Sequence, residues 1–199
     1  MKRIVLSLAA VAILAGCASS NQPAAPATVA APDYKYLIGP GDNLNIQVWR
    51  NPELTATVPV RPDGKVSSPL IEDLVAMGKN PTQLSREIEQ QLKKFIQDPV
   101  VTVIVTSFVG PHSEQVRIVG SAARPSALPF RQSMTVLDAM IAVGGITEFA
   151  SGNRAVLVRA ADGGKQYNLR LKDLLRSGDI SANADLRPGD VIIIPEGWF

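Results

Sequence analysis

A short apolar run that ends in the only cysteine constrains this chain more than any other feature. Residues 4–14 form the run, Lys2 and Arg3 precede it, and Cys17 follows it after two small residues. A transmembrane helix needs roughly 20 apolar residues, so the run is too short to span a bilayer, and its flanks are typical of a secretory signal. A single cysteine leaves no partner for an intrachain disulfide, and the fold therefore depends on a packed core.

Residues 1–16 resemble the signal peptide of a bacterial lipoprotein, in which the cysteine after the cleavage site is acylated and becomes the mature N-terminus. The resemblance implies lipidation of Cys17, and several acyl chains on one residue hold a protein firmly to a membrane. Ala18 stands where enterobacterial lipoproteins kept in the inner membrane have Asp, which implies the periplasmic face of the outer membrane. The alternative is an ordinary signal peptide with an incidental cysteine.

The charge balance argues against a nucleic-acid partner. The 20 basic residues of the chain become 18 when Lys2 and Arg3 leave with the signal, against 18 acidic residues. Proteins that bind nucleic acid carry clustered positive charge, which this sequence lacks. Residues 17–33 are rich in Ala and Pro and have no hydrophobic periodicity, so we expect a lipid anchor followed by a disordered linker.

A Gly-Pro pair at residues 110–111 divides the rest of the chain into modules of residues 34–110 and 111–199. Both modules mix strand and helix patterns, so we expect an α+β fold made of two small mixed α/β-sheet modules. The first strand follows residues 39–42 (Gly-Pro-Gly-Asp). We expect at least one of these glycines to have a positive φ.

The first module begins with strand patterns. Leu44, Ile46 and Val48 alternate with polar residues, which predicts a half-buried strand. Residues 55–61 predict a second strand, and the Pro-Asp-Gly turn after it predicts that residues 65–70 return antiparallel to it.

An amphipathic helix and a further strand complete this module. Asn80 and Gln83 have the spacing of a capping box, and Pro81 suits the first helical position. Residues 100–108 are mostly apolar on both faces, which predicts a central, covered strand. The apolar stripe of the helix comprises Leu84, Ile88, Leu92, Phe95 and Ile96.

The order of strand and helix patterns in the second module predicts a small mixed sheet curled over one helix. Thr135 caps that helix and a pair of glycines ends it. A Pro-Gly-Asp turn at residues 188–190 repeats the turn at residues 40–42, although so common a turn is weak support for a duplicated fold. The expected strands are residues 115–120, 127–130, 154–160, 165–169 and 191–195, and the expected helices are residues 136–143 and 171–176.

In order and spacing, the motifs of the first module resemble the polysaccharide export domain of Wza-like outer-membrane polysaccharide export proteins. The second module is similar to a soluble-ligand-binding β-grasp (SLBB) domain. The motifs that carry the resemblance are residues 36–42, 46–49, 60–66, 69–71 and 98–103 in the first module and residues 116–120, 135–139, 142–145 and 186–190 in the second. The signature positions, to which we assign structural roles, are Tyr36, Gly39, Gly41, Asp42, Asp63, Gly64, Gly144, Gly145, Gly189 and Asp190.

The sequence departs from the family pattern in two places. Residues 124–126 (Arg-Pro-Ser) stand where the family usually has Pro-Gly, so we expect a different turn there. Large members continue through a second SLBB domain to a pore-lining amphipathic helix, whereas this chain stops at Phe199. It resembles the short exporters, and that resemblance implies a separate outer-membrane β-barrel as partner. Trp198 and Phe199 are a possible interface with a partner or a neighbouring subunit, the alternative being packing in their own core.

The residues that carry enzyme chemistry are sparse. His112 is the only histidine, it falls in a loop, and no nucleophile motif accompanies it. The acidic pairs Glu87 with Glu89 and Asp185 with Asp190 are interpreted as solvated positions, not as metal ligands. The sequence leaves open whether the fold brings together a pair of carboxylates for glycoside hydrolysis, because such residues can be far apart along the chain. We therefore expect no catalytic residue, no metal and no cofactor.

The resemblance implies a non-enzymatic, lipid-anchored component of an exopolysaccharide export channel. Copies of the chain are expected to form a homo-oligomeric ring through which the polymer passes. The expected partners are the exopolysaccharide, other copies of the chain, the outer-membrane β-barrel and an inner-membrane polysaccharide co-polymerase. The alternative is a sugar-binding or adaptor lipoprotein that forms no conduit, and the sequence identifies no sugar-binding residues for either function.

Overall fold

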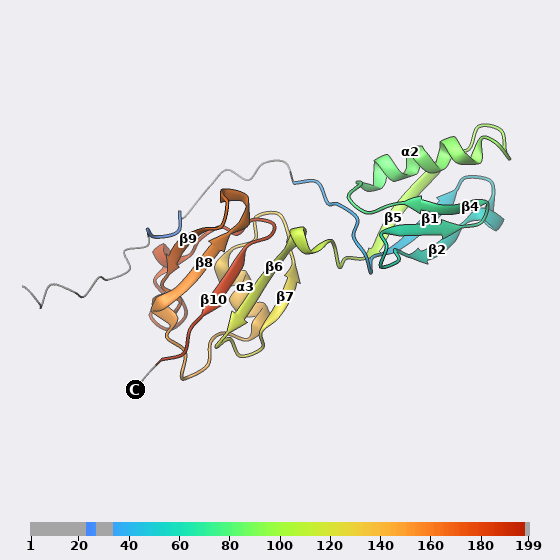
Figure 1. Cartoon of the computed structure of the whole chain (residues 1–199). Helices are drawn as coiled ribbons and strands as arrows, with labels where there is room; N and C mark the ends of the chain where they lie inside the picture. Colours follow the sequence, from blue (N-terminus) through green and yellow to red (C-terminus); the bar gives the residue numbers. More distant parts are fainter. Residues whose placement is uncertain (1–22, 27–33, 198–199) are drawn as a thin grey trace, which may run out of the picture.

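A computed structural model describes residues 23–26 and 34–197, which form two modules joined by short connecting segments (Figure 1). Each module combines a main β-sheet with helical segments, so the expected α+β fold class is confirmed. Within the described residues, no helix has both the length and the apolar character that a membrane span requires.

In the first module, one face of a three-stranded antiparallel sheet packs against a helix (Figure 1). Leu44, Ile46 and Val48 are buried, as their alternation predicted. Leu84 and Ile88 of the helix lie in the same core, and a capping box begins the helix as expected. The elements are β1 (Asn43–Val48), β2 (Ala56–Pro59), β3 (Lys65–Ser68), β4 (Ile71–Val75), α2 (Pro81–Leu92) and β5 (Val101–Ser107).

Two strand predictions for this module are wrong. The sheet order is β2-β1-β5, so β5 is an edge strand with one open face, and Ile104 on that face is 43% exposed. β3 pairs with β4 and not with β2, because the chain turns at Leu70, where φ is +64°, into a separate hairpin. A single backbone hydrogen bond from Arg61 N–H to the carbonyl oxygen of Lys65 joins the two predicted partners.

The helix is also shorter than its apolar stripe predicted. It ends at Leu92, and Phe95, which was expected on the buried stripe, is 58% exposed. After Leu92 the chain turns back to reach β5, and Asp98 adopts a φ of +45° just before Pro99. The last part of the stripe therefore lies in a turn, where helical periodicity no longer sets which side chains face the core.

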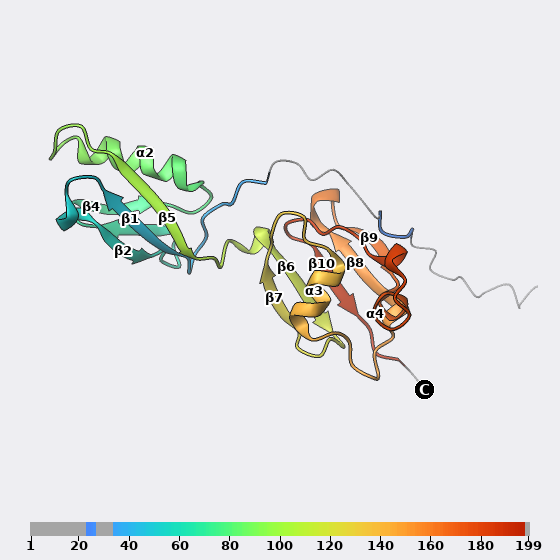
Figure 2. The same cartoon turned by 180° about the vertical axis from the view of Figure 1, so that it is seen from behind.

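In the second module, a five-stranded sheet packs against α3, which lies in front of the sheet in Figure 2. The strand order is β7-β6-β10-β8-β9, with β10 parallel to β6 and the other neighbours antiparallel. Asp138 N–H donates to the Thr135 hydroxyl oxygen at the start of α3, and Gly144 ends the helix with a φ of +80°, both as expected. The elements are β6 (Gln115–Gly120), β7 (Ser126–Pro129), α3 (Val136–Val143), β8 (Ala155–Arg159), β9 (Lys165–Leu169), α4 (Leu171–Arg176) and β10 (Val191–Ile194).

Residues 23–26, the described part of the segment expected to be a disordered linker, pair with β9. Asn168 N–H donates to the carbonyl oxygen of Pro23 (3.0 Å), and Ala25 N–H donates to the carbonyl oxygen of Asn168 (3.4 Å). Asn168 belongs to β9, an edge strand whose outer backbone groups are open to pairing. Residues 23–26 are therefore attached to the second module, which the composition of the linker did not predict.

Candidate functional site

The buried carboxylate of Asp42 organises the connection between the two modules. Its Oδ2 accepts hydrogen bonds from Gly39 N–H (2.9 Å) and from the Tyr36 hydroxyl (2.6 Å). Its Oδ1 accepts from Val109 N–H (2.7 Å) and Gly110 N–H (2.8 Å), which lie on the segment that leaves β5 for the second module. One side chain at the start of β1 thus holds four donors from two segments of the chain.

Two glycines of this turn are required for different reasons. Gly41 has a φ of +88°, which confirms the expected positive φ and disfavours any side chain. A Cβ at Gly39 would lie 2.1 Å from the backbone nitrogen of Pro111, so a larger residue would displace the connecting segment. The turn can therefore approach the junction only because both positions lack side chains.

Aromatic side chains pack on either side of this junction. The rings of Tyr36 and Phe108 meet edge to face at 5.2 Å, and those of Tyr34 and Phe130 do so at 4.9 Å. Phe130 belongs to the core of the second module, so Tyr34, which the sequence assigns to the first module, contacts the second. Burial, followed by the hydrogen bond to Asp42, raises the pKa of Tyr36, so its hydroxyl keeps the proton that it donates.

The second Pro-Gly-Asp turn holds a buried ion pair. Asp190 Oδ2 accepts from Arg187 N–H (2.9 Å) and lies 3.5 Å from Nε of Arg159, whose side chain is also buried. Arg159 Nη2 donates to the carbonyl oxygen of Asp185 (2.7 Å). Burial raises the pKa of Asp190 above its ordinary value, although Arg159 and the Arg187 N–H act in the opposite direction. The interpretation of Asp190 as a solvated position is therefore wrong.

The remaining signature positions stabilise turns. Asp63 is exposed and bonds the Arg61 guanidinium, while Gly64 has a φ of +77° and lies against Met77. Gly144 and Gly145 have φ values of +80° and +84° at the end of α3, and Gly189 has a φ of +81°. The structure does not bring these positions together with one another. Cys17, Trp198 and Phe199 lie outside the described residues.

His112 and Glu89, two titratable residues weighed in the sequence analysis, lie in different surroundings. His112 is exposed in its loop, and no group of three or more possible metal ligands occurs among residues 23–26 and 34–197. Glu89, which was expected to be solvated, is mostly buried, and its carboxylate accepts from Val101 N–H (3.0 Å) and from Arg86. Burial alone would raise the pKa of Glu89, but these donors hold it below its ordinary value. The ordered contacts of Glu89 are those of a structural residue.

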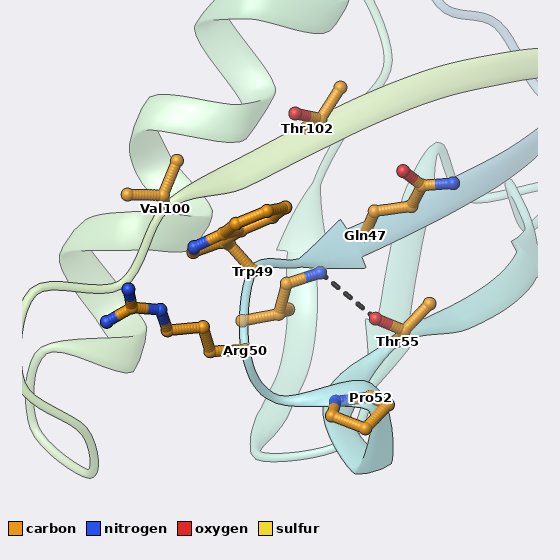
Figure 3. A pocket seen from close by; sticks show the side chains of 8 residues that line it. Gln47, Trp49, Arg50, Pro52, Thr55, Val100 and Thr102 are labelled. Atoms are coloured by element: carbon orange, nitrogen blue, oxygen red, sulfur yellow. Dashed lines mark hydrogen bonds between the residues drawn. The ribbon is translucent and has the colours of Figure 1, made fainter.

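An open hollow of about 290 Å³ lies where β1 ends and β5 begins (Figure 3). Trp49 N–H donates to the carbonyl oxygen of Val100 (2.9 Å), so Trp49 continues the outward-facing side of β1 with 69% of its surface exposed. The sequence analysis did not single out this site. The available signal was the outward spacing of Trp49, two residues after Gln47. The hollow is lined by Gln47, Val48, Trp49, Arg50, Pro52, Thr55, Val100 and Thr102.

Each of the two modules matches a known protein family. A family described as "Polysaccharide biosynthesis/export protein" matches residues 30–106, and the SLBB domain family matches residues 114–194. The EPS I polysaccharide export outer membrane protein EpsA of Ralstonia nicotianae is 28% identical over 185 residues, which cover 81% of this chain and 47% of that protein. The exopolysaccharide production protein ExoF of Rhizobium meliloti is 26% identical over 210 residues, covering 98% of this chain and 47% of ExoF.

A shorter match is more similar in sequence. The capsule polysaccharide export outer membrane protein CtrA of Neisseria meningitidis is 31% identical over 129 residues, which cover 65% of this chain and 31% of CtrA. The chain spans about half the length of EpsA and ExoF. The similarity therefore identifies the families that the two modules match, an export domain and an SLBB domain.

Proposed function

Because this chain belongs to the outer-membrane polysaccharide export proteins and carries an SLBB domain, we propose that it is a component of an exopolysaccharide export channel. The observation that carries the proposal is the order of the two matches, an export domain followed by an SLBB domain, across nearly all of the described residues. The function is non-enzymatic in this proposal, and the protein acts by guiding the polymer through the cell envelope.

The proposed mechanism is geometric. Copies of the chain associate through heterologous contacts, which close into a ring when the rotation between neighbours allows it. The Asp42 junction supports this arrangement, because four hydrogen bonds at one carboxylate favour one orientation of the export domain relative to the chain that enters the SLBB domain. A fixed orientation within each copy is what a closed ring of two-domain subunits needs.

The proposed location is the periplasmic face of the outer membrane. Lipidation of Cys17 would anchor the chain there, and the names of EpsA and CtrA as outer membrane proteins support the outer membrane as the compartment. The proposed partners are the exopolysaccharide, a separate outer-membrane β-barrel and an inner-membrane polysaccharide co-polymerase. These partners are proposed from the resemblance to outer-membrane polysaccharide export proteins.

A sugar-binding adaptor that forms no conduit is a second candidate, and the exposed Trp49 hollow is the observation that favours it. The two functions differ in assembly. A stable ring of the lipidated protein in detergent supports the channel component, whereas a monomer with measurable affinity for sugars supports the adaptor.

Deletion of the gene followed by complementation tests the proposed function. The deletion strain is expected to stop secreting exopolysaccharide, measured as polymer in the culture medium, and the wild-type gene is expected to restore secretion. The Cys17→Ser variant is expected to restore secretion poorly and to be lost from the outer-membrane fraction, because a serine cannot receive the thioether-linked lipid. Normal secretion by the deletion strain would contradict the proposed function, and normal secretion and location with Cys17→Ser would contradict the anchor.

A further inference from the structure

The face of the first sheet that α2 leaves open carries mainly amide and hydroxyl groups, with the aliphatic Ile104 among them, and its strands place no charged side chain there. Asn43, Asn45 and Gln47 alternate with the buried residues of β1 and so point to this open face. The strand register places Thr57 of β2 beside Asn45 and Thr102 of β5 beside Gln47. Asn45 Nδ2 donates to the Thr57 hydroxyl (2.9 Å), so part of this polar row is already ordered.

Aliphatic side chains fill the centre of the corresponding face of the second sheet, and Arg117, Gln166 and Asn168 lie on the same face. The register aligns Ile193 of β10 with Val119 of β6 and Val156 of β8, and it aligns Val191 with Val158. These side chains alternate with core residues, and Ile193 and Val119 are exposed. The open face of the first sheet therefore differs in that its row of amide and hydroxyl groups runs along the central strand β1 and includes no charged side chain.

The Trp49 hollow lies at the end of this polar row (Figure 3). The exposed indole of Trp49 stands beside Val100, which is 56% exposed, and together they form an apolar platform. Such a platform combined with a few polar groups is typical of a site for small organic groups. A pyranose ring fits this combination, because its C–H face is apolar while its hydroxyl groups form a polar edge.

Arg50 supplies the cationic donor of the hollow. It lies in the turn after β1 and adopts a φ of +63°, a conformation that is costly for a residue with a side chain. Among the residues that the structure describes, its guanidinium forms no ion pair. Its five N–H donors are therefore available to hydroxyl or carboxylate oxygens of a ligand.

A second hollow, of about 740 Å³ beside the start of α2, has no exposed indole. Two of its charged residues already bond to neighbours, since Arg86 bonds Glu89 and Glu87 pairs with Lys79, whereas Lys35 on its wall has no ion pair among the described residues. Asn80 and Gln83 on its wall satisfy each other in the capping box. The Trp49 hollow therefore differs in combining an exposed indole with polar side chains that no ion pair or capping box engages.

We propose that Trp49, Gln47, Arg50 and Thr102 form a binding subsite for pyranose rings of the transported polysaccharide. The subsite rests on the proposed function for the identity of its ligand and on the hollow for its position. A sugar ring stacks on the Trp49 indole, the hydroxyl groups exchange hydrogen bonds with Gln47 and Thr102, and Arg50 donates to a ring substituent. The amide row of β1 offers further hydrogen bonds to the next units of the polymer, which suits a chain that must slide.

Equilibrium dialysis of the mature, lipidated protein in detergent tests the subsite. The probe is a fluorescently end-labelled oligosaccharide made by partial acid hydrolysis of the exopolysaccharide that the source organism secretes. Trp49→Ala is expected to raise Kd about tenfold, since stacking on one aromatic ring contributes energies of this order. Trp49→Tyr is expected to keep most of the affinity, and Phe95→Ala is the matched control, because Phe95 is an exposed aromatic outside the hollow.

Equal binding by wild type and Trp49→Ala, or no binding by wild type, would overturn the subsite. Self-association that Trp49→Ala abolishes without any effect on sugar binding would also overturn it, in favour of a protein contact. Thermal melting checks that Trp49→Ala folds, which is expected because the side chain is exposed. The gene deletion separates the two claims: loss of secretion together with unchanged sugar binding by Trp49→Ala removes the subsite and leaves the proposed function standing.

Discussion

The two modules contain the same Pro-Gly-Asp turn and use its aspartate differently. In each turn the aspartate accepts a hydrogen bond from the N–H three residues earlier, and the glycine before it has a φ near +85°: +88° at Gly41 and +81° at Gly189. Asp42 then binds donors from the segment between the modules, whereas Asp190 faces the buried Arg159 within one module. The local sequence thus determines the turn, and the surrounding fold determines what the carboxylate does.

The surroundings also determine how well each carboxylate is satisfied. All four hydrogen bonds of Asp42 come from groups held in place by the backbone or by a packed tyrosine. Asp190 Oδ1, by contrast, has no hydrogen-bond partner in the described structure, and burial raises the pKa of that side chain. We therefore expect substitutions at Asp42 to act mainly on the junction, and substitutions around Asp190 to act on the second module in a pH-dependent way.

The largest expected effect is that of Asp42→Ala. Removing the carboxylate leaves the N–H groups of Gly39, Val109 and Gly110 without their acceptor, and the free energy of unfolding is expected to fall by about 4 kcal/mol. Urea unfolding followed by circular dichroism measures the loss. Asp63→Ala is the matched control, because that turn carboxylate is exposed, and its unfolding midpoint should stay close to wild type. Equal midpoints for the two variants would remove the special role of Asp42.

Arg159→Met is expected to have the next largest effect, and the effect should depend on pH. The substitution removes the cation beside Asp190 and is expected to lower the free energy of unfolding by about 3 kcal/mol at pH 7. The pKa of Asp190 is raised in the folded state. Between the ordinary pKa and this raised pKa, Asp190 holds a proton in the folded protein and releases it in the unfolded chain. The free energy of unfolding therefore falls as the pH rises through this range.

Without Arg159 the pKa of Asp190 in the folded state rises further, so the fall in the free energy of unfolding with rising pH becomes larger by neutral pH. At pH 3 and below, where Asp190 is protonated in the folded state and largely protonated in the unfolded chain, the difference from wild type is expected to shrink. Urea unfolding at pH 3 and pH 7 measures this change. A difference that is the same at both pH values would show that Asp190 contributes nothing to the effect.

The smallest expected effect is a paired substitution of the two turn glycines. Gly41→Ala and Gly189→Ala both place a side chain at a positive φ, which costs about 1 kcal/mol. The Gly189 variant should lose more, because its Cβ would lie 3.1 Å from the carbonyl oxygen of Ser113, while the Cβ at Gly41 has ordinary contacts. Melting temperatures measure the two losses, and a larger loss at Gly41 would contradict the comparison.

Local signals in the sequence predicted the elements that depend on neighbouring residues. The capping boxes at Asn80 and Thr135 and the bounds of α3 are confirmed, since both ends of a helix are encoded within a few residues. The failures depend on distant contacts. β5 was expected to be central, but a sequence does not show whether the outer side of Ile104 is covered. The burial of Asp190 was missed because Arg159 reaches it from another strand.

The candidate sites follow the same rule. The donors to Asp42 Oδ1 are the N–H groups of Val109 and Gly110, which lie 67 and 68 residues further along the chain. The sequence could therefore mark Asp42 as a signature position without showing that it binds the segment between the modules. Trp49 was part of a recognised motif, yet its exposure depends on the end of the β1–β5 ladder. Chain folding creates both sites, and they became visible only when the strand register was known.

Photo-crosslinking in exporting cells tests most directly whether the polymer passes along this protein. A photoreactive amino acid replaces Thr102 beside the Trp49 hollow in one strain, and it replaces Ile193 on the open face of the second sheet in another. The account predicts a polysaccharide adduct at position 102 only while the cells export polymer, and a much weaker adduct at position 193. An export-competent strain with no polysaccharide adduct at position 102, or with equal adducts at both positions, would contradict it.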